Sequence, residues 1–407
     1  MSWGKVKIGD CCEITSSKRI FYSEYVESGV PFYRSKEIIE SSSGQAISEP
    51  LFISQEKYDE IKRNSGVPQP GDMLLTSVGT IGVPYIVKKD DYFYFKDGNL
   101  TWFRKFNGKL EPKYLYYWVR SAEGQGVLYN TTIGSSQKAL TIASLKGLEI
   151  PCPPIVVQNR IVEILTGYDA LIEINQKQVK LLEEAAQRLY KEWFVDLRFP
   201  GHETTPIVDG IPEGWEEKAM ADICDSIGGG TPSTKNDEYY REGKIRWVTP
   251  TDITRKNGLI LLDTEKKITE EGLRNSSAKM VPPYTILMTS RASVGFFGLC
   301  EHEVCTNQGF ISCVPYQENV RCYLLHNLMS RVDEIRAKAS GSTFLEISKK
   351  TFRDLRIILP SDCILDAFNK QVWPMVRQME ALTTSIVKLQ EARDRLLPKL
   401  MSGEIEV

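Results

Sequence analysis

The sequence predicts an α+β protein in which two homologous globular domains and a pair of long coiled-coil helices form an internal repeat. A short Ser/Thr loop occurs twice, as LTSVGTIG in 75–82 and as MTSRASVG in 288–295, each time after an aliphatic run. Apolar residues recur at alternating spacings of three and four over 161–193 and 372–400, which indicates heptad helices. The remaining sequence is rich in β-branched and aromatic residues punctuated by Gly and Pro, as expected for sheets.

The composition limits the class of protein. With 407 residues the chain exceeds one ordinary hydrophobic core, so two or three domains are expected. No run of about 18 apolar residues occurs, and MSWGKVKIGD lacks the apolar core of a signal peptide. We therefore expect a cytoplasmic protein without a membrane span. The net charge of −2 excludes a uniformly basic nucleic-acid binder but leaves room for a local basic face.

Matched segments extend the repeat on both sides of the loop. Upstream, FYRSKEII in 32–39 matches RWVTPTDI in 246–253. Downstream, 134–151 matches 341–360, since in both a glycine and small hydroxyl residues precede an Ile/Leu-rich strand that stops at proline. The duplication therefore covers a whole domain rather than one motif.

A helical segment follows each globular domain. The predicted boundaries are 1–150 and 213–360 for the globular domains, 151–199 and 361–407 for the helices, and 200–212 for a polar, proline-rich linker. The expected seam residues are Ile161, Ile164, Tyr168, Ile172, Asn175, Val179, Leu182, Ala186, Leu189 and Trp193 in the first helix, and Val372, Met375, Met379, Leu382, Ile386, Leu389, Arg393, Leu396 and Leu400 in the second.

Two such helices can bury their apolar stripes against each other and hold the globular domains apart. The alternative is that each helix packs on its own domain, and the polar seam residues Asn175 and Arg393 leave it open. Pro374 predicts a kink in the second helix or the start of its straight part.

The sequence shows no catalytic constellation. It contains no P-loop, and SIGGGTPSTK indicates a turn because no Gly-Lys-Ser/Thr closes it. The Asn/Asp-Pro-Pro-Tyr/Phe tetrapeptide of an adenine methyltransferase is missing, and His202, His302 and His326 stand in no catalytic motif. Cys300 and Cys305 flank His302, but zinc needs two spaced ligand pairs, so reduced thiols are the preferred interpretation. We expect no catalytic, cofactor-binding or metal-binding residue.

A duplicated domain at a fixed spacing suits a DNA target with two separated half-sites. Ser, Thr, Lys and backbone N–H groups bind phosphates, whereas Arg, Gln and Asn can read base edges. We expect Arg291 and Gln137 to read bases and Lys36 and Lys138 to bind phosphates. The predicted DNA-binding residues are Arg34, Ser35, Lys36, Thr76, Ser77, Thr80, Ser135, Gln137, Lys138, Trp247, Thr249, Thr251, Ser290, Arg291, Ser293, Ser342 and Lys349.

Several longer segments are distinctive: EEAAQRLYKEWFVDLRFPGHE, IPEGWEEKAMADICDSIGGGTPSTKN with WVTPTDI after it, LLPKLMSGEI, PCPPIVVQNRIVEIL and the two Ser/Thr-Gly loops. Through these segments the chain resembles, over almost its whole length, the specificity (S, or HsdS) subunits of type I restriction–modification systems. The second helix entry, LPSDCILDAFNKQV, departs from the usual PPxxxQxxI pattern.

The resemblance implies that the globular domains are target recognition domains, each reading one half of a bipartite double-stranded DNA site. It implies that the helices form an antiparallel coiled coil that sets the half-site spacing and docks two methyltransferase (M) subunits. Restriction (R) subunits join these, and S-adenosylmethionine, ATP and Mg are expected on the partner subunits, with none on this chain.

Two other classes of function stay open. One is a single-chain restriction and methylation enzyme with unrecognised catalytic motifs, which would bind S-adenosylmethionine itself. The other is a coiled-coil adaptor that binds protein or carbohydrate through its β-rich domains. A gel shift on bipartite DNA with and without a methyltransferase subunit separates these from a DNA-recognition subunit.

Overall fold

The computed structural model describes residues 3–44, 47–134, 138–255, 258–341 and 344–407. The chain divides into two compact units, unit 1 with Met1–Leu171 and Lys388–Val407 and unit 2 with Ile172–Val387. Helices α6 (Ile155–Tyr190) and α12 (Asp362–Ser402) each contribute residues to both units.

Unit 1 alternates short strands with short helices. Its strands are β1 Lys5–Lys7, β2 Glu13–Thr15, β3 Tyr25–Val26, β4 Val30–Tyr33, β5 Leu51–Ile53, β6 Met73–Thr76, β7 Pro84–Ile86, β8 Tyr94–Phe95, β9 Leu100–Arg104 and β10 Glu149–Pro151. Its helices before α6 are α1 Ser35–Ser42, α2 Gln55–Asn64, α3 Pro112–Arg120, α4 Ala122–Thr131 and α5 Ile142–Gly147, with 3-10 turns at Ile8–Asp10 and Tyr22–Glu24.

Unit 2 has a closely similar order of elements. Its strands are β11 Ile207–Val208, β12 Ile211–Pro212, β13 Glu216–Ala219, β14 Cys224–Gly228, β15 Ile245–Val248, β16 Lys267–Ile268, β17 Met280–Val281, β18 Ile286–Thr289, β19 Phe297–Gly298, β20 Val304–Thr306, β21 Phe310–Pro315 and β22 Arg356–Leu359. Its shorter helices are α7 Pro250–Thr254, α8 Glu270–Arg274, α9 Val320–Ser330, α10 Val332–Ala337 and α11 Lys349–Arg353, with 3-10 turns at Met220–Asp222 and Asp237–Tyr239.

The two units have closely similar sheet topologies. The strand orders are β1-β10, β2-β9-β6-β7 and β3-β5-β4-β8 in unit 1, and β13-β22, β14-β21-β18-β19 and β16-β15-β20-β17 in unit 2. The central pairs β4–β8 and β15–β20 are both parallel, and each has an antiparallel neighbour, β5 or β16. The third sheets differ in their edge strands, β3 and β17. The predicted fold class and internal repeat are confirmed.

Strand register refines the upstream match by one residue. Phe32 lies opposite Tyr94 in the parallel pair of unit 1, and Trp247 lies opposite Cys305 in that of unit 2. Phe32 therefore corresponds to Trp247 and not to Arg246, which the sequence alignment placed over it. The error arose because short strands of mixed apolar residues align equally well in neighbouring registers.

The helices that begin after these strands agree with the corrected register. The N–H of Arg34 donates to the Glu37 carboxylate at 2.6 Å, and that of Thr249 donates to the Asp252 carboxylate at 2.8 Å. An acidic side chain three residues into a helix satisfies the free N–H group at its start, so both helices begin in the same way.

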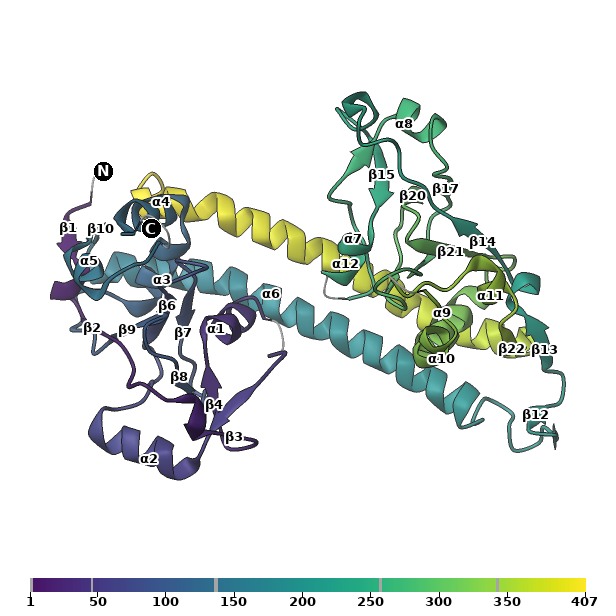
Figure 1. The fold of residues 1–407 in the computed structure, drawn as a ribbon, viewed down its shortest axis with the longest axis horizontal. Coiled ribbons are helices and arrows are strands. Elements are labelled where there is room, and N and C mark those ends of the chain that lie inside the picture. The colour runs from purple at the N-terminus through teal and green to yellow at the C-terminus, as the bar shows by residue number, and fades with distance from the viewer. Residues whose placement is uncertain (1–2, 45–46, 135–137, 256–257, 342–343) are drawn as a thin grey trace. The chain divides into compact units, whose positions relative to one another are not determined.

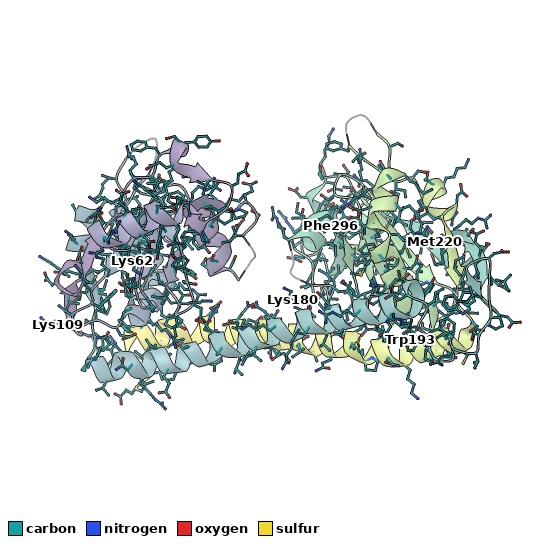
Figure 2. The ribbon with its side chains drawn as sticks, turned by 90° about the horizontal axis from the view of Figure 1, so that it is seen from below. Lys62, Lys109, Lys180, Trp193, Met220 and Phe296 are labelled. Carbon is teal, nitrogen blue, oxygen red and sulfur yellow. The ribbon has the colours of Figure 1, made fainter. Side chains whose placement is uncertain are left out.

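The long helices pack both on each other and on the globular part of each unit. Figure 1 shows α6 and α12 side by side within each unit, and Figure 2 shows them along one side of the globular part. The helix residues in the two cores are Ile161, Leu165, Leu397, Leu400 and Met401 in unit 1, and Val179, Ala186, Tyr190, Ile364, Leu365, Phe368, Val372, Val376 and Met379 in unit 2. Packing of the helices on each other and packing of the helices on a globular part, which the sequence left as alternatives, therefore both occur within each unit.

Contacts inside unit 2 fix the helix direction. The amide of Asn175 on α6 donates to Ser385 Oγ on α12 at 3.2 Å, whereas the rings of Tyr190 and Phe368 lie 6.3 Å apart. A higher residue number on α6 therefore meets a lower number on α12, so the pair is antiparallel.

The helix α12 continues through Pro374, and the expected kink or start of its straight part at this residue stays a prediction. The segment 200–212, predicted as a polar, proline-rich linker, contains the small β11–β12 hairpin. A π-helical turn at Lys191–Val195 ends the first helix. No helix of the described part of the chain is long and apolar enough to cross a membrane.

Candidate nucleic-acid interface

The duplicated Ser/Thr loop is closed by the same hydrogen bonds in both units. In unit 1 the N–H of Thr76 donates to Val83 O at 3.1 Å, and the N–H of Val83 donates to Thr76 Oγ1 at 2.9 Å. In unit 2 the N–H of Thr289 donates to Phe296 O, and the N–H of Phe296 donates to Thr289 Oγ1, both at 2.9 Å. Figure 2 labels Phe296, which ends this loop. A threonine at the end of the strand therefore uses its backbone and its hydroxyl to hold the loop.

The backbone inside the two loops also matches. Gly82 and Gly295 have φ of 84° and 86°, in the left-handed region that favours glycine. Gly79 has φ of 79°, and its counterpart Ala292 adopts φ of 61° although it carries a Cβ. An alanine in this region costs roughly 1–2 kcal/mol, which the surrounding hydrogen bonds must offset.

In unit 1 the serine of the loop joins two further segments. The N–H of Ser77 donates to Asn99 O at 2.8 Å, and Ser77 O accepts from the N–H of Leu140 at 2.9 Å. Val78 forms a β-bridge with Ala139. The Ser/Thr loop, the turn before β9 and the segment before α5 therefore lie together.

In unit 2 Ser290 makes the corresponding contacts. Its N–H donates to Gly309 O at 2.8 Å, and its carbonyl accepts from the N–H of Ile347 at 3.0 Å. Arg291 forms the bridge with Glu346 that Val78 forms in unit 1. The same three segments thus meet in both copies, with arginine at a position where the other copy has valine.

A fourth segment, which follows the strand β2 or β14, completes the surface. In unit 1 the N–H of Gly98 donates to Ser16 Oγ at 3.4 Å, and Arg19 Nε lies 2.8 Å from Asp97 Oδ2. In unit 2 the Thr231 hydroxyl donates to the exposed Gln308.

We call the surface formed by these four segments the loop face. It comprises 16–19, 76–83, 96–99, 133–134 and 138–140 in unit 1, and 228–231, 289–296, 307–309, 340–341 and 344–347 in unit 2. Sequence reasoning missed Arg19, Thr231 and Gln308, and it interpreted SIGGGTPSTK as a simple turn. These residues could have been identified by extending the repeat alignment back to the segments that follow β2 and β14.

Several predicted DNA-binding residues are exposed on or beside the loop face. Thr80, Lys138, Arg291 and Ser293 lie on it, and Lys349 begins α11 with its Nζ near the end of β14. These side chains are available to a ligand.

The two predicted DNA-binding cations on the loop face, Arg291 and Lys138, have weak protein partners. Arg291 has a side chain that is 45% exposed, with Nε 3.6 Å from Glu346 Oε2 and the guanidinium 5.9 Å from the Phe344 ring. Lys138 Nζ lies 3.5 Å from the centre of the Tyr129 ring, and its hydrogen bond lowers the pKa of the Tyr129 hydroxyl. Exposed ion pairs of this kind contribute about 0–1 kcal/mol, so a phosphate or base can replace them.

Four predicted contacts are corrected, because Thr76, Ser77, Trp247 and Ser290 are buried. The Ser77 hydroxyl lies 2.6 Å from Thr101 Oγ1, and the Trp247 indole N–H donates to the carbonyl of the glycine at 230 at 2.9 Å. A buried side chain with internal partners does not reach a ligand on the surface. Thr76, Ser77 and Ser290 thus belong to the framework of the loop face, and Trp247 supports that framework from outside through the carbonyl at residue 230.

The remaining predicted residues lie at the starts of α1 and α7. Arg34 forms a two-pronged ion pair with the buried Glu37, and Lys36 Nζ lies 2.9 Å from Glu49 Oε2. Ser35 and Thr251 stand in the first turns of these helices, and the Thr249 hydroxyl donates to the Asp252 carboxylate at 2.7 Å. Contacts of these five residues with DNA stay predictions; the predicted residues Ser135, Gln137 and Ser342 lie outside the described residues.

Two specificity subunits of type I restriction enzymes match parts of this chain in sequence. It is 35% identical over 153 residues to the type I restriction enzyme MjaIX specificity subunit of Methanocaldococcus jannaschii, which is 37% of this chain and 35% of that protein. It is 26% identical over 328 residues to the type I restriction enzyme HindI specificity subunit of Haemophilus influenzae, which is 65% of this chain and 71% of that protein. The first of these alignments thus spans about a third of its relative.

A solved structure has the same fold. The crystal structure of the type I restriction–modification system S subunit from M. genitalium aligns with a TM-score of 0.60, covering 98% of this chain and 96% of that one, at 16% sequence identity. The family model for the type I restriction modification DNA specificity domain matches twice, at residues 1–184 and 212–392. With the same domain matched in both halves and most of its length covered, the chain belongs to the type I restriction modification DNA specificity family.

Proposed function

We propose that the chain is the DNA specificity subunit of a type I restriction–modification complex, in which each unit reads one half of a bipartite DNA site. The observation that carries the proposal is the loop face, which is built twice from one topology and one set of loop-closing hydrogen bonds. Two domains that recognise different half-sites need the same framework but different exposed side chains.

The chemistry of the loop face supports DNA as the ligand. It offers hydroxyls at Thr80 and Ser293, the cation of Lys138 and the fork of Arg291, which together can hold phosphates and read a guanine. Val78 in unit 1 occupies the place of Arg291 in unit 2. We therefore expect the two half-sites to differ in sequence at the base pair that this position reaches.

The helices support the finer part of the proposal, that they set the half-site spacing and dock two methyltransferase subunits. The helix α6 exposes Val156 and Leu171 in unit 1 and Ile174 and Leu181 in unit 2, with exposed fractions between 50% and 75%. Contiguous exposed apolar surfaces mark sites that bind other proteins, and these side chains would contribute to such a surface. Catalysis, with S-adenosylmethionine, ATP and Mg, and assembly with restriction subunits are then functions of the partner subunits.

Methylome sequencing of cells that carry the intact system tests this function, because it reports both half-sites and the gap between them. A gel shift with the chain and a methyltransferase subunit on the site so found provides the direct binding measurement. Methylation by the purified chain alone would instead favour a single-chain enzyme, and the absence of any shift on DNA would favour an adaptor protein.

Replacing Arg291 with alanine should relax recognition at one base pair of the second half-site. The loss of a two-pronged contact to one base typically costs about 1–3 kcal/mol, so binding to the preferred site should fall while binding to the site mutated at that base pair changes little. Competition gel shifts across the four possible base pairs measure this effect.

The matched control is Arg241→Ala, which removes the same charge from an exposed position of unit 2 outside the loop face. It should leave the base preference unchanged. Equal weakening of Arg291→Ala on every sequence would show that Arg291 binds a phosphate and reads no base.

A further inference from the structure

In unit 1 a hydrogen-bonded cluster joins the globular part to both long helices. Asp169 on α6 accepts from the Tyr117 hydroxyl of α3 at 2.6 Å through Oδ2, and from Arg393 of α12 at 2.6 Å through Oδ1. Arg393 is only 12% exposed, and Arg120 lies 3.8 Å from the same carboxylate. Burial, followed by the hydrogen bond to Asp169, raises the pKa of Tyr117, so its hydroxyl stays protonated and donates.

In unit 2 a tyrosine hydroxyl, a carboxylate and an arginine guanidinium also meet, at positions that do not correspond in the repeat to those of unit 1. The Tyr284 hydroxyl, between β17 and β18, lies 3.1 Å from Oε2 of Glu380 on α12. Arg377 of α12 donates to Glu380 Oε2 at 2.6 Å and also to the Tyr284 hydroxyl. The Glu380 side chain is 6% exposed, and the Tyr284 ring packs edge-on against Trp373 at 4.9 Å.

Backbone strain at Tyr284 marks this second cluster. Tyr284 adopts φ of 58°, a conformation that is strained for a bulky residue and persists where surrounding contacts stabilise it. Here the contacts with Glu380, Arg377 and Trp373 hold the tyrosine against α12.

The other contacts between each globular part and the helices combine apolar packing with neutral or single hydrogen bonds, such as that of the buried Gln158 with Lys109 O and that of Asn327 with the Tyr190 hydroxyl. Apolar side chains of similar size tolerate a shift along a helix, whereas a carboxylate held by an arginine and a tyrosine hydroxyl tolerates little displacement. The Glu380 carboxylate is buried, and the Asp169 side chain is 29% exposed. A tyrosine hydroxyl on a helix carboxylate therefore defines where a globular part sits along the helix pair of its own unit.

We propose that Asp169 with Tyr117 and Glu380 with Tyr284 are positioning pairs that fix each globular part on the helices, and so determine which gap between half-sites the protein accepts. The inference rests on the proposed function. It adds specificity-determining residues that lie outside the loop face and do not touch DNA.

The unit 2 pair should also respond to pH. Burial, and then the neighbouring Glu301 carboxyl, raise the pKa of Glu380 from 4.5 to about 7, while Arg377 opposes the shift. Tyr284 also faces this carboxyl, and His302 pairs with Glu301 at 3.3 Å.

The folded protein thus holds a proton on Glu380 that the unfolded chain releases near pH 4.5. This contribution to stability is complete below pH 4.5 and is lost as the pH rises towards about 7. The thermal midpoint should accordingly fall more between about pH 5 and pH 8 in the wild type than in Glu380→Gln. The exposed control Glu184→Gln should keep the wild-type slope, and an equal slope in Glu380→Gln would contradict the assignment.

The decisive experiment compares Tyr117→Phe and Tyr284→Phe with two matched controls in the complete complex with methyltransferase subunits. Each variant removes one hydroxyl from a positioning pair. The control Tyr114→Phe removes a hydroxyl of α3 that bonds to Pro151 O, and Tyr240→Phe removes one that bonds to Pro232 O, both within the globular parts.

Methylome sequencing should show the native half-sites in all four variants. In Tyr117→Phe and Tyr284→Phe the ratio of methylation at gaps one base pair longer or shorter to methylation at the native gap should rise roughly tenfold, the factor that corresponds to about 1.4 kcal/mol. The controls should keep the native gap. If Tyr117→Phe does not assemble, Asp169→Asn tests the same pair.

A uniform loss of methylation at the native gap alone would reduce these residues to a structural role and overturn the inference. A wild-type complex whose methylated sites are not bipartite would overturn the proposed function itself. The two failures are therefore separate, because the first is seen in the variants and the second in the wild type.

Discussion

Replacing residues 1–150 with the same region of another family member is expected to change one half of the methylated sequence completely and to leave the other half as it was. The physical reason is that the loop face of unit 1 is assembled from segments between Ser16 and Leu140, all within the exchanged region. Unit 2 closes its own loop face with its own backbone hydrogen bonds. Methylome sequencing of cells with the exchanged and the parent protein measures both halves at once.

The exchange must preserve the apolar contacts between the new globular part and the helices. The residues to match are those that pack around Ile161 and Leu165 of α6 and Leu397 and Leu400 of α12. The reciprocal exchange of residues 213–360 is the control, and it should change only the other half-site. A change in both halves after either exchange would show that the units do not read DNA independently.

The second large effect is expected from lengthening both helices by seven residues, after Asn175 in α6 and after Ser385 in α12. These two residues face each other across the seam of unit 2, with the amide of Asn175 3.2 Å from Ser385 Oγ. A heptad keeps the apolar stripe in phase and adds roughly 10 Å of helix, or about three base pairs of DNA. The accepted gap should lengthen by that amount, with both half-sites unchanged.

An insertion that breaks the heptad in α6 alone is the matched control. It rotates and shifts the apolar seam of one helix against an unchanged partner, so the complex should lose activity. The methylome of each variant, together with the thermal midpoint of the purified protein, separates a changed gap from a loss of folding. An unchanged gap with full activity after the double insertion would remove the helices from the determination of spacing.

The sequence by itself determined the repeat and the helix pair. Both rest on patterns that can be recognised in the sequence without knowledge of the fold. A heptad stripe follows from helix geometry, and the paired threonines and glycines of the two loops are needed locally, since Thr76 and Thr289 close the loops and Gly82 and Gly295 supply positive φ.

The tertiary structure decided which loop residues are exposed and where each globular part is fixed to the helices. Ser77 and Ser290 look like surface hydroxyls in the sequence, but neighbouring strands and loops bury them, and the short β4 and β15 strands fixed a register that sequence alignment missed by one. The contacts of Asp169 with Tyr117 and of Glu380 with Tyr284 join residues 52 and 96 positions apart. No local pattern encodes such pairs, because burial and long-range hydrogen bonding depend on how distant segments pack, whereas periodicity and turn chemistry depend on neighbours along the chain.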